Sequence, residues 1–176
     1  MKYSPTDFEA FTHQAATLLK SLIRIPSLSR EETACADFLE KYLTDCDAHP
    51  QRHGNNIWCI QPLHHEGQPT LLLNAHIDTV KPAAGWQRPP FEPLVEGDRI
   101  YGLGSNDCGG GLVCLLHAFL ALSKGFSPTV WYFSPRPRRR CRDAMASRVF
   151  CHSCHPSTLL WWASLPECVR PLPKRG

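Results

Sequence analysis

Apolar residues in the first 45 positions recur at helical spacing in two stretches. The first stretch contains Phe8, Phe11, Ala15, Leu18 and Leu22, and it begins at a Thr6-x-x-Glu9 pattern typical of a capping box. It predicts a helix over about residues 7–24, before Pro26. The second contains Ala36, Leu39 and Leu43 after a Ser29-x-x-Glu32 pattern, and predicts a helix that ends near Thr44.

The middle of the chain carries shorter apolar runs that are typical of strands. Residues 56–60 form one run, residues 70–75 form a buried central strand, and a short strand is expected around Ile100. A proline-rich surface loop is expected over residues 82–93, and a helix over residues 108 to about 124. This order of elements predicts an α/β fold in which helices flank a mixed sheet.

The pattern changes near Pro128. Residues 129–133 are compatible with one more strand, but the sequence Ser134-Pro135-Arg136 and the arginines after it are not expected inside a sheet. Residues 1–128 contain 10 Lys and Arg against 14 Asp and Glu, whereas residues 129–176 contain 9 against 2. We therefore predict part of a folded domain over residues 1–128 and an aberrant, disordered basic tail over residues 129–176.

A candidate site begins where the central strand ends, at His76-Ile77-Asp78. Residues two apart in a strand lie on the same face, and a metal-bound histidine needs a carboxylate that fixes its tautomer. His76 is therefore the candidate ligand and Asp78 its orienting partner. Gly102 and Gly104 allow a sharp turn before Asp107, which can point into the same cleft, and Cys108 is expected to be a small buried residue.

These residues are compatible with two other interpretations. A single His-x-Asp at a strand end is more often an ordinary hydrogen-bonded pair than a metal site. A phosphate-binding role for Gly102-x-Gly104 is disfavoured, because Asp107 replaces the third glycine of a dinucleotide fingerprint and would repel phosphate.

Several segments together resemble a known family: His76-Ile77-Asp78-Thr79-Val80, Gly85-Trp86, Pro90-Phe91 and Tyr101-Gly102-x-Gly104-x-x-Asp107. They are similar to the zinc-dependent amidohydrolases that include acetylornithine deacetylase, succinyl-diaminopimelate desuccinylase, aminoacylase and glutamate carboxypeptidase. The resemblance covers roughly the first 128 residues and is closest to the acetylornithine deacetylase branch, which acts in arginine biosynthesis. It implies the incomplete N-terminal part of a zinc-peptidase-like catalytic domain.

The resemblance also implies roles for the site residues. His76 would bind one zinc ion, Asp78 would be the catalytic residue that orients it, and Asp107 would bridge two zinc ions, with Co²⁺ as an alternative metal. The implied reaction is hydrolysis of the amide bond of an N-acyl amino acid, by a homodimer in intact relatives. The family's Glu-Glu pair, its later zinc-binding glutamate, its distal histidine and its lid domain are missing here, so we expect little or no activity from the 176 residues alone.

The codons of the tail can also be read in a shifted frame, in which the last base of each codon joins the first two bases of the next. In that frame the codons possible for residues 135–156 permit an amino-acid sequence that begins Glu-Ala-Glu-Glu-Glu. Trp161-Trp162-Ala163 forces Val-Gly in that frame, and the residues after it permit Glu-Pro-Thr-Gly. Both family motifs then occur in the expected order. We therefore predict a one-nucleotide loss near Pro128, through a pseudogene event or a sequencing error.

The tail offers an alternative function as well. Cys151-His152-Ser153-Cys154-His155 matches a haem-attachment pattern and contains four zinc-competent side chains, and the arginines at 136–142 form a basic cluster. The alternative is a non-catalytic fragment that binds metal or nucleic acid through this tail. Nucleic acid is the less favoured partner, because prolines interrupt the arginines.

The cysteine count and the distribution of apolar residues indicate in which cellular compartment the protein is expected. The chain has nine cysteines, an odd number, with no export signal and no run of about 18 apolar residues. We therefore expect reduced thiols, a cytoplasmic location and no membrane partner.

Overall fold

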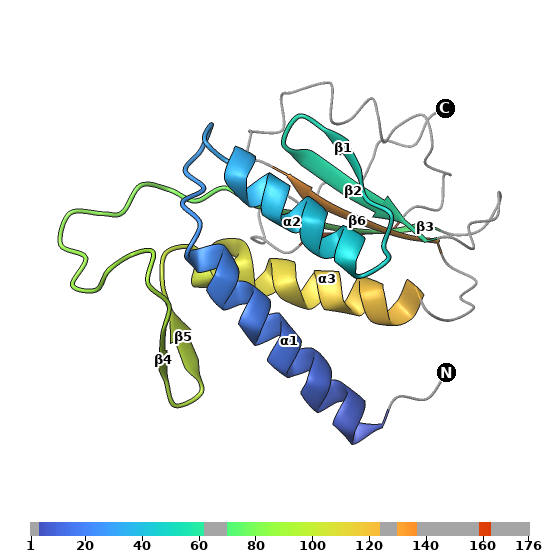
Figure 1. Cartoon of the computed structure of the whole chain (residues 1–176), viewed down its shortest axis with the longest axis horizontal. Helices are drawn as coiled ribbons and strands as arrows, with labels where there is room; N and C mark the ends of the chain where they lie inside the picture. The colour runs from blue at the N-terminus through green and yellow to red at the C-terminus, as the bar shows by residue number, and fades with distance from the viewer. Residues whose placement is uncertain (1–3, 62–69, 124–129, 137–158, 163–176) are drawn as a thin grey trace.

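The computed structural model describes residues 4–61, 70–123, 130–136 and 159–162 (Figure 1). Helices precede and interrupt the strands of an α/β fold. The elements in chain order are α1 (Pro5–Ile23), α2 (Thr33–Asp45), β1 (Gln51–His53), β2 (Asn56–Ile60), β3 (Thr70–His76), β4 (Leu94–Glu96), β5 (Arg99–Tyr101), the π-helical turn η1 (Ser105–Gly109), α3 (Gly110–Ser123), β6 (Val130–Arg136) and β7 (Leu159–Trp162).

Five strands form one mixed sheet in the order β1-β2-β6-β3-β7. β1 and β6 run antiparallel to β2, whereas β6 and β7 run parallel to β3 on its two sides. Helix α3 connects β3 to β6 and packs on both, as the crossover of a parallel pair requires. The predicted α/β class with a mixed sheet and flanking helices is confirmed.

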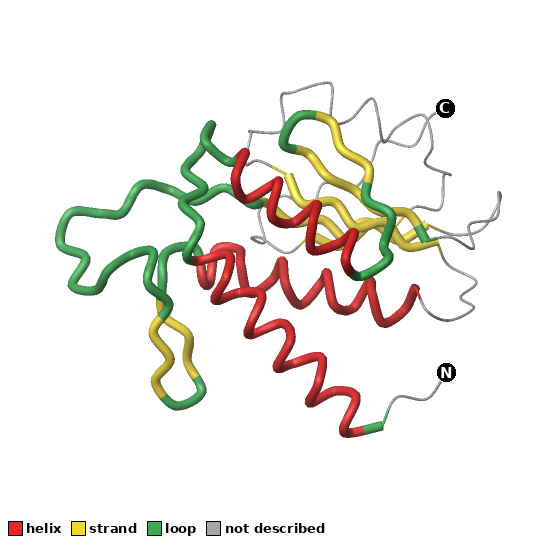
Figure 2. The backbone as a smooth tube through the Cα atoms, viewed as in Figure 1, coloured by secondary structure: helices red, strands yellow, loops and turns green. Residues whose placement is uncertain are grey.

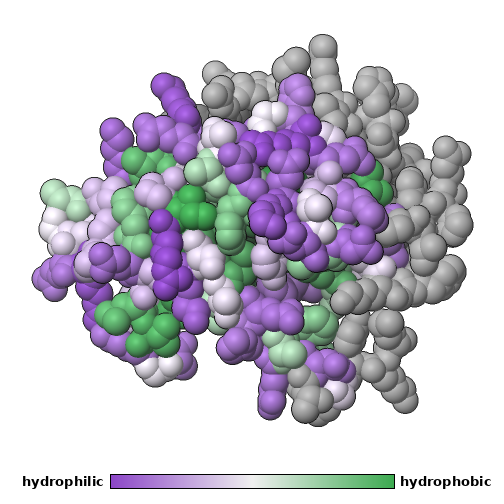
Figure 3. Space-filling view, viewed as in Figure 1, coloured by the Kyte–Doolittle hydropathy of each residue, from purple (hydrophilic) through white to green (hydrophobic). Residues whose placement is uncertain are grey.

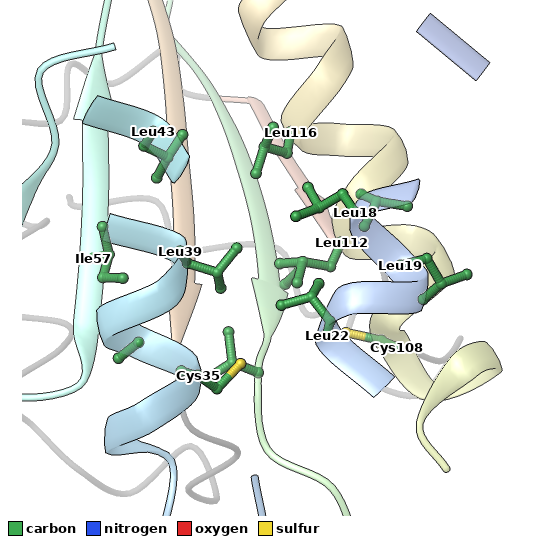
Figure 4. Close-up of a cluster of buried hydrophobic side chains, with 14 of the residues drawn as sticks. Leu18, Leu19, Leu22, Cys35, Leu39, Leu43, Ile57, Cys108, Leu112 and Leu116 are labelled. Carbon is green, nitrogen blue, oxygen red and sulfur yellow. The ribbon is translucent and has the colours of Figure 1, made fainter. Parts of the chain in front are cut away.

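A single hydrophobic cluster joins the three helices to the sheet (Figure 4). Leu39 and Leu43 of α2 are fully buried in it, as is Leu116 of α3. From the sheet the cluster receives Ile57 and Cys59 of β2 and Leu73 and Ala75 of β3. Because Leu73 and Ala75 face the helices, alternation along β3 places Asn74 and His76 on the opposite face.

Both helix starts differ from the predicted capping boxes. In α1 the cap is Ser4, whose hydroxyl accepts from Asp7 N at 3.3 Å while Ser4 N donates to Asp7 Oδ2 at 2.7 Å. Pro5 fits the first helical turn, where no amide donor is needed. Helix α2 begins later than predicted, after Glu32, which makes no side-chain cap.

Strand β6 corrects the expectation that Ser134-Pro135-Arg136 lies outside the sheet. All three residues pair with β3, where Asn74, Ala75 and His76 are their partners. Pairing with β2 occurs at Tyr132 and Phe133. At Pro135 the missing amide donor is therefore tolerated, because β6 pairs on only one side there.

The predicted helix over residues 108–124 is two elements, η1 and α3. By length and composition alone, the span Ser105–Ser123 is apolar enough to cross a membrane. Its residues Leu112, Val113, Leu116 and Phe119 are buried in the hydrophobic cluster. The apolarity of this span is therefore explained by its packing against α1 and β3.

A long loop and a hairpin extend from this helix–sheet body. Figure 2 shows the loop after β3 as a green tube that reaches outward and returns to the small sheet of β4 and β5. β4 and β5 pair antiparallel around a turn at Gly97, which has φ +61°. This excursion returns the chain to Tyr101, from which η1 reaches the end of β3.

Candidate metal centre

The candidate site lies at the carboxyl end of β3. His76 is the last residue of this strand and is 7% exposed, and Asp107 lies in η1 with its side chain half-exposed. The distance between His76 Nε2 and Asp107 Oδ1 is 3.0 Å. The structure therefore brings together the two predicted ligands, which are 31 residues apart in the sequence.

Asp78 holds the other ring nitrogen of His76. His76 Nδ1 lies 3.0 Å from the backbone carbonyl oxygen of Asp78 and 3.4 Å from its carboxylate Oδ1. With Nδ1 donating to these oxygens, Nε2 donates to Asp107 Oδ1 while the ring is protonated, and loss of the Nε2 proton leaves the Nδ1-protonated tautomer with a lone pair on Nε2. This is the tautomer that a metal ligand needs.

Ser29 also belongs to the candidate site, although the sequence analysis did not select it. Its hydroxyl donates to Asp78 Oδ2 at 2.5 Å, across 49 residues of sequence. The loop that carries Ser29 is fixed to the strand end, because Ser29 N donates to the carbonyl of Thr79 and Thr79 N donates to that of Ser27. The Ser29-x-x-Glu32 pattern predicted a helix cap, and it contained no signal for this contact.

Cys108 connects η1 to the backbone of His76. Its Sγ accepts from His76 N at 3.3 Å and donates to His76 O at 3.1 Å. Cys108 is 3% exposed, which confirms the expectation that it is a buried residue. The thiol thereby sets the spacing between the end of β3 and the turn that carries Asp107.

Gly104 gives η1 its starting conformation. Its φ is +74°, in the left-handed region that favours glycine, and a Cβ there would lie 2.5 Å from Thr79 Cγ2. Its carbonyl accepts from Gly109 N at 2.8 Å and closes the turn around Asp107. The two requirements explain the glycine that the sequence pattern contains at this position.

The site is electrostatically suited to a cation. Burial lowers the pKa of His76, but hydrogen bonds with Asp78, and further ones with Cys108 and Asp107, raise it, and the resulting pKa is about 10. The surroundings therefore favour positive charge on or next to the imidazole. A metal ion at Nε2 would take the place of that proton.

The donor atoms fit zinc. Two ligands at ~2.0 Å on one tetrahedral zinc ion are separated by about 3.3 Å, close to the observed 3.0 Å between His76 Nε2 and Asp107 Oδ1. Among the residues that the structure describes, no group of three or more His, Cys, Asp or Glu side chains converges. His76 and Asp107 alone supply two candidate donors, fewer than the four that a zinc site uses.

A cavity of about 250 Å³ opens over the pair. Its lining includes His76, Asp78 and Asp107 together with the apolar side chains of Trp86 and Leu103. The cavity gives a small polar group access to the histidine and the carboxylate.

Comparison with known proteins connects this geometry to a family. Residues 72–133 match the model of peptidase family M20/M25/M40, a segment that includes His76, Asp78 and Asp107. This match supports the predicted resemblance over residues 72–133.

Curated relatives of this chain carry the name succinyl-diaminopimelate desuccinylase. The protein from a Nitratiruptor species is 31% identical over 102 residues, which cover 57% of this chain and 28% of the relative. The protein from Blochmanniella floridana is 36% identical over 109 residues, 58% of this chain and 28% of the relative. The chain thus spans under a third of the length of these relatives, and the acetylornithine branch is not specifically supported.

Solved structures show the same fold. The di-peptidase Dug1p from Saccharomyces cerevisiae has a TM-score of 0.61 at 19% identity, covering 81% of this chain and 35% of its own. Human carnosine dipeptidase 1 has a TM-score of 0.59 at 17% identity, covering 82% of this chain and 36% of its own. The predicted incomplete catalytic-domain fold is therefore confirmed.

The predicted metal-binding and nucleic-acid-binding motifs of the tail are not part of the site described above. The Cys/His motif at 151–155 and the arginines at 138–142 lie outside the residues that the structure describes. Within the described part of the chain, Cys35, Cys46, Cys59, Cys108 and Cys114 are free thiols.

Proposed function

We propose that the catalytic domain to which this chain belongs is a metal-dependent amidohydrolase that cleaves the amide bond of an N-acyl amino acid. The observation that carries this proposal is the 3.0 Å approach of His76 Nε2 to Asp107 Oδ1, with Nδ1 of the same ring held by Asp78. The match to the M20 family supports metal-dependent hydrolysis. Acetylornithine and succinyl-diaminopimelate are the first two substrates to test.

Each residue of the candidate site has a separate role in this proposal. His76 and Asp107 would hold the metal, with zinc favoured by the nitrogen and oxygen donors and cobalt as the alternative. Asp78 keeps the proton of His76 on Nδ1, and Ser29 fixes the Asp78 carboxylate. The bound metal would supply Lewis acidity and lower the pKa of a water molecule at neutral pH.

The strand register indicates where further metal ligands could lie: at the carboxyl ends of β6 and β7. Parallel strands β6 and β7 flank β3, so their carboxyl ends lie at the same edge as His76. Residue 136 pairs with His76, and residue 162 pairs with Asn74, two positions before His76. Acidic residues at or just after these positions would be close enough in the sheet to complete a metal site.

The shifted reading frame encodes acidic residues at these places. It permits glutamate across codons 135 and 136, and another across codons 163 and 164, two positions beyond residue 162. In the present frame, position 136 is Arg, which does not ligate metals. We therefore propose that the frame changes after Phe133, where the family match ends, and that the boundary predicted at residue 128 lies slightly too early.

Metal stoichiometry tests the proposal. We expect the full chain to bind Zn²⁺ measurably, and His76→Ala and Asp107→Asn to abolish that binding, while His53→Ala in the exposed strand β1 leaves it unchanged. The double variant Cys151→Ser/Cys154→Ser addresses the tail. Loss of zinc in this double variant alone, with His76→Ala unaffected, would favour the alternative of a tail-based metal-binding fragment.

Activity tests the reaction. We expect the present chain to hydrolyse N-acyl amino acids little or not at all, because two ligands hold zinc weakly and no general base is among the described site residues. A gene with one nucleotide inserted after codon 133, continued into its downstream sequence, is expected to gain zinc-dependent hydrolysis. A frame-restored protein that binds zinc but cleaves none of acetylornithine, succinyl-diaminopimelate and N-acetylphenylalanine would contradict the proposed reaction.

A further inference from the structure

A second, larger cavity adjoins the metal centre. It measures about 600 Å³ and shares Trp86, Gly102 and Ser105 with the cavity over His76 and Asp107. A substrate whose amide lies at the metal can therefore extend directly into this space. Figure 3 shows hydrophobic surface gathered on the hairpin of β4 and β5, which supplies part of its wall.

The wall of the larger cavity is mainly apolar. Its apolar contributors come from the loop after β3 and from the hairpin: Trp86, Pro89, Pro93, Leu94 and Tyr101. Trp86 and Leu94 are each 43% exposed, which is high for large hydrophobic side chains. An occupant that covers them would gain the free energy of removing apolar surface from water.

The charged residues of this wall do not provide a free anion site. The Arg88 guanidinium lies 4.2 Å from the centre of the Tyr101 ring and 3.1 Å from the carboxylate of Glu96. Glu92 lines the same cavity. A carboxylate entering the cavity would meet an arginine that already has a partner, together with a second negative charge.

We propose, on the basis of the proposed function, that this cavity binds an uncharged, apolar substituent of the N-acyl amino acid substrate. The substituent can be on either side of the amide, as an aromatic or aliphatic acyl group or as an apolar amino-acid side chain. Trp86 and Leu94 are the specificity-determining residues. A succinyl group, whose free carboxylate would extend toward Glu92, is disfavoured.

Binding to the metal-free full chain tests this inference separately from metal chemistry. The protein is labelled with 5-fluorotryptophan, and the Trp86 resonance is assigned with Trp86→Phe. The probes are N-benzoylglycine, N-acetylphenylalanine, N-acetylglycine and N-succinylglycine. We expect at least one of the two aromatic probes to shift the Trp86 resonance saturably, with a Kd about tenfold or more below those of N-acetylglycine and N-succinylglycine.

Two neighbouring positions give matched variants. Leu94→Asp places a charge in the cavity wall and should raise the Kd about tenfold, whereas Val95→Asp, an exposed neighbour that does not line the cavity, should leave it unchanged. The aromatic probe that binds identifies the side of the amide. Equal binding of N-succinylglycine, an unmoved Trp86 resonance with both aromatic probes, or equal effects of the two variants would overturn the inference.

Zinc stoichiometry separates the two proposals. If zinc fails to bind at His76 and Asp107 while the aromatic probe binds at Trp86, the proposed function fails and the cavity assignment stands. If zinc binds as proposed and no aromatic probe reaches Trp86, the cavity assignment alone fails.

Discussion

Replacing Gly104 by alanine tests how the turn before Asp107 is built. Gly104 has φ +74°, and an added Cβ would lie 2.5 Å from Thr79 Cγ2. For an alanine the left-handed conformation costs ~1–2 kcal/mol. Overpacking against Thr79 adds ~1–3 kcal/mol, so Gly104→Ala should destabilise the fold by about 2–5 kcal/mol in total.

Two further variants separate these contributions. Gly97 in the hairpin also has a positive φ, +61°, but a Cβ there meets nothing within 4 Å. Gly97→Ala should therefore cost only the backbone contribution of ~1–2 kcal/mol. In the Gly104→Ala background, Thr79→Ser removes the clashing methyl group and should recover most of the ~1–3 kcal/mol overpacking cost, while its hydroxyl can still reach Ser27 O.

Urea unfolding followed by circular dichroism measures these differences. We expect Gly104→Ala to lower the unfolding free energy clearly more than Gly97→Ala, and Thr79→Ser to rescue the former. Equal losses in the two glycine variants, or no rescue by Thr79→Ser, would refute the close contact between the turn and the strand end.

Three other outcomes follow from the structure. Cys108→Val removes both thiol hydrogen bonds to the His76 backbone and should weaken zinc binding about tenfold in calorimetry, whereas Cys108→Ser should change it little. Burial raises the pKa of Cys35 and Cys59 to about 12, so iodoacetamide at pH 8 should modify exposed Cys114 before Cys35 and Cys59 in peptide mass mapping, and the reverse order would disprove their burial. Sequencing the DNA from codon 133 onward should find the acidic motif in the shifted frame, and its absence would end the frame proposal.

Local patterns predicted much of the fold. The strand at Asn56–Ile60 is confirmed with its predicted bounds, and the central strand extends by one residue to His76. Both follow from apolar runs that can be read without knowing what they pack against. The predicted positions of the two helix starts are less accurate, because several polar residues near each start are capable of capping.

The parts that sequence did not predict depend on contacts distant in the chain. The sequence pattern predicts a helix-capping role for Ser29, yet its hydroxyl donates a hydrogen bond to Asp78, and only the folded structure brings these two residues together. Pro135 was excluded from the sheet, yet it lies in β6 at a position paired on one side only. Neither outcome has a local signal, because each is set by the neighbours that the tertiary structure supplies.

The candidate site lies between these cases. His76, Asp78 and Asp107 were selected from motifs, and the structure places His76 within 3.4 Å of both carboxylates. Their role as metal-binding residues stays a prediction. Cys108 was expected to be buried, but its two hydrogen bonds to the His76 backbone required the coordinates of the turn.

The most direct test of the metal centre is a zinc titration of the full chain, followed through the imidazole nitrogen resonances of ¹⁵N-labelled histidine. The account predicts that Nε2 of His76 changes to the shift of a metal-bound nitrogen while Nδ1 stays protonated beside Asp78. Zinc-dependent changes restricted to His152 and His155, with the His76 ring unaffected, would contradict it.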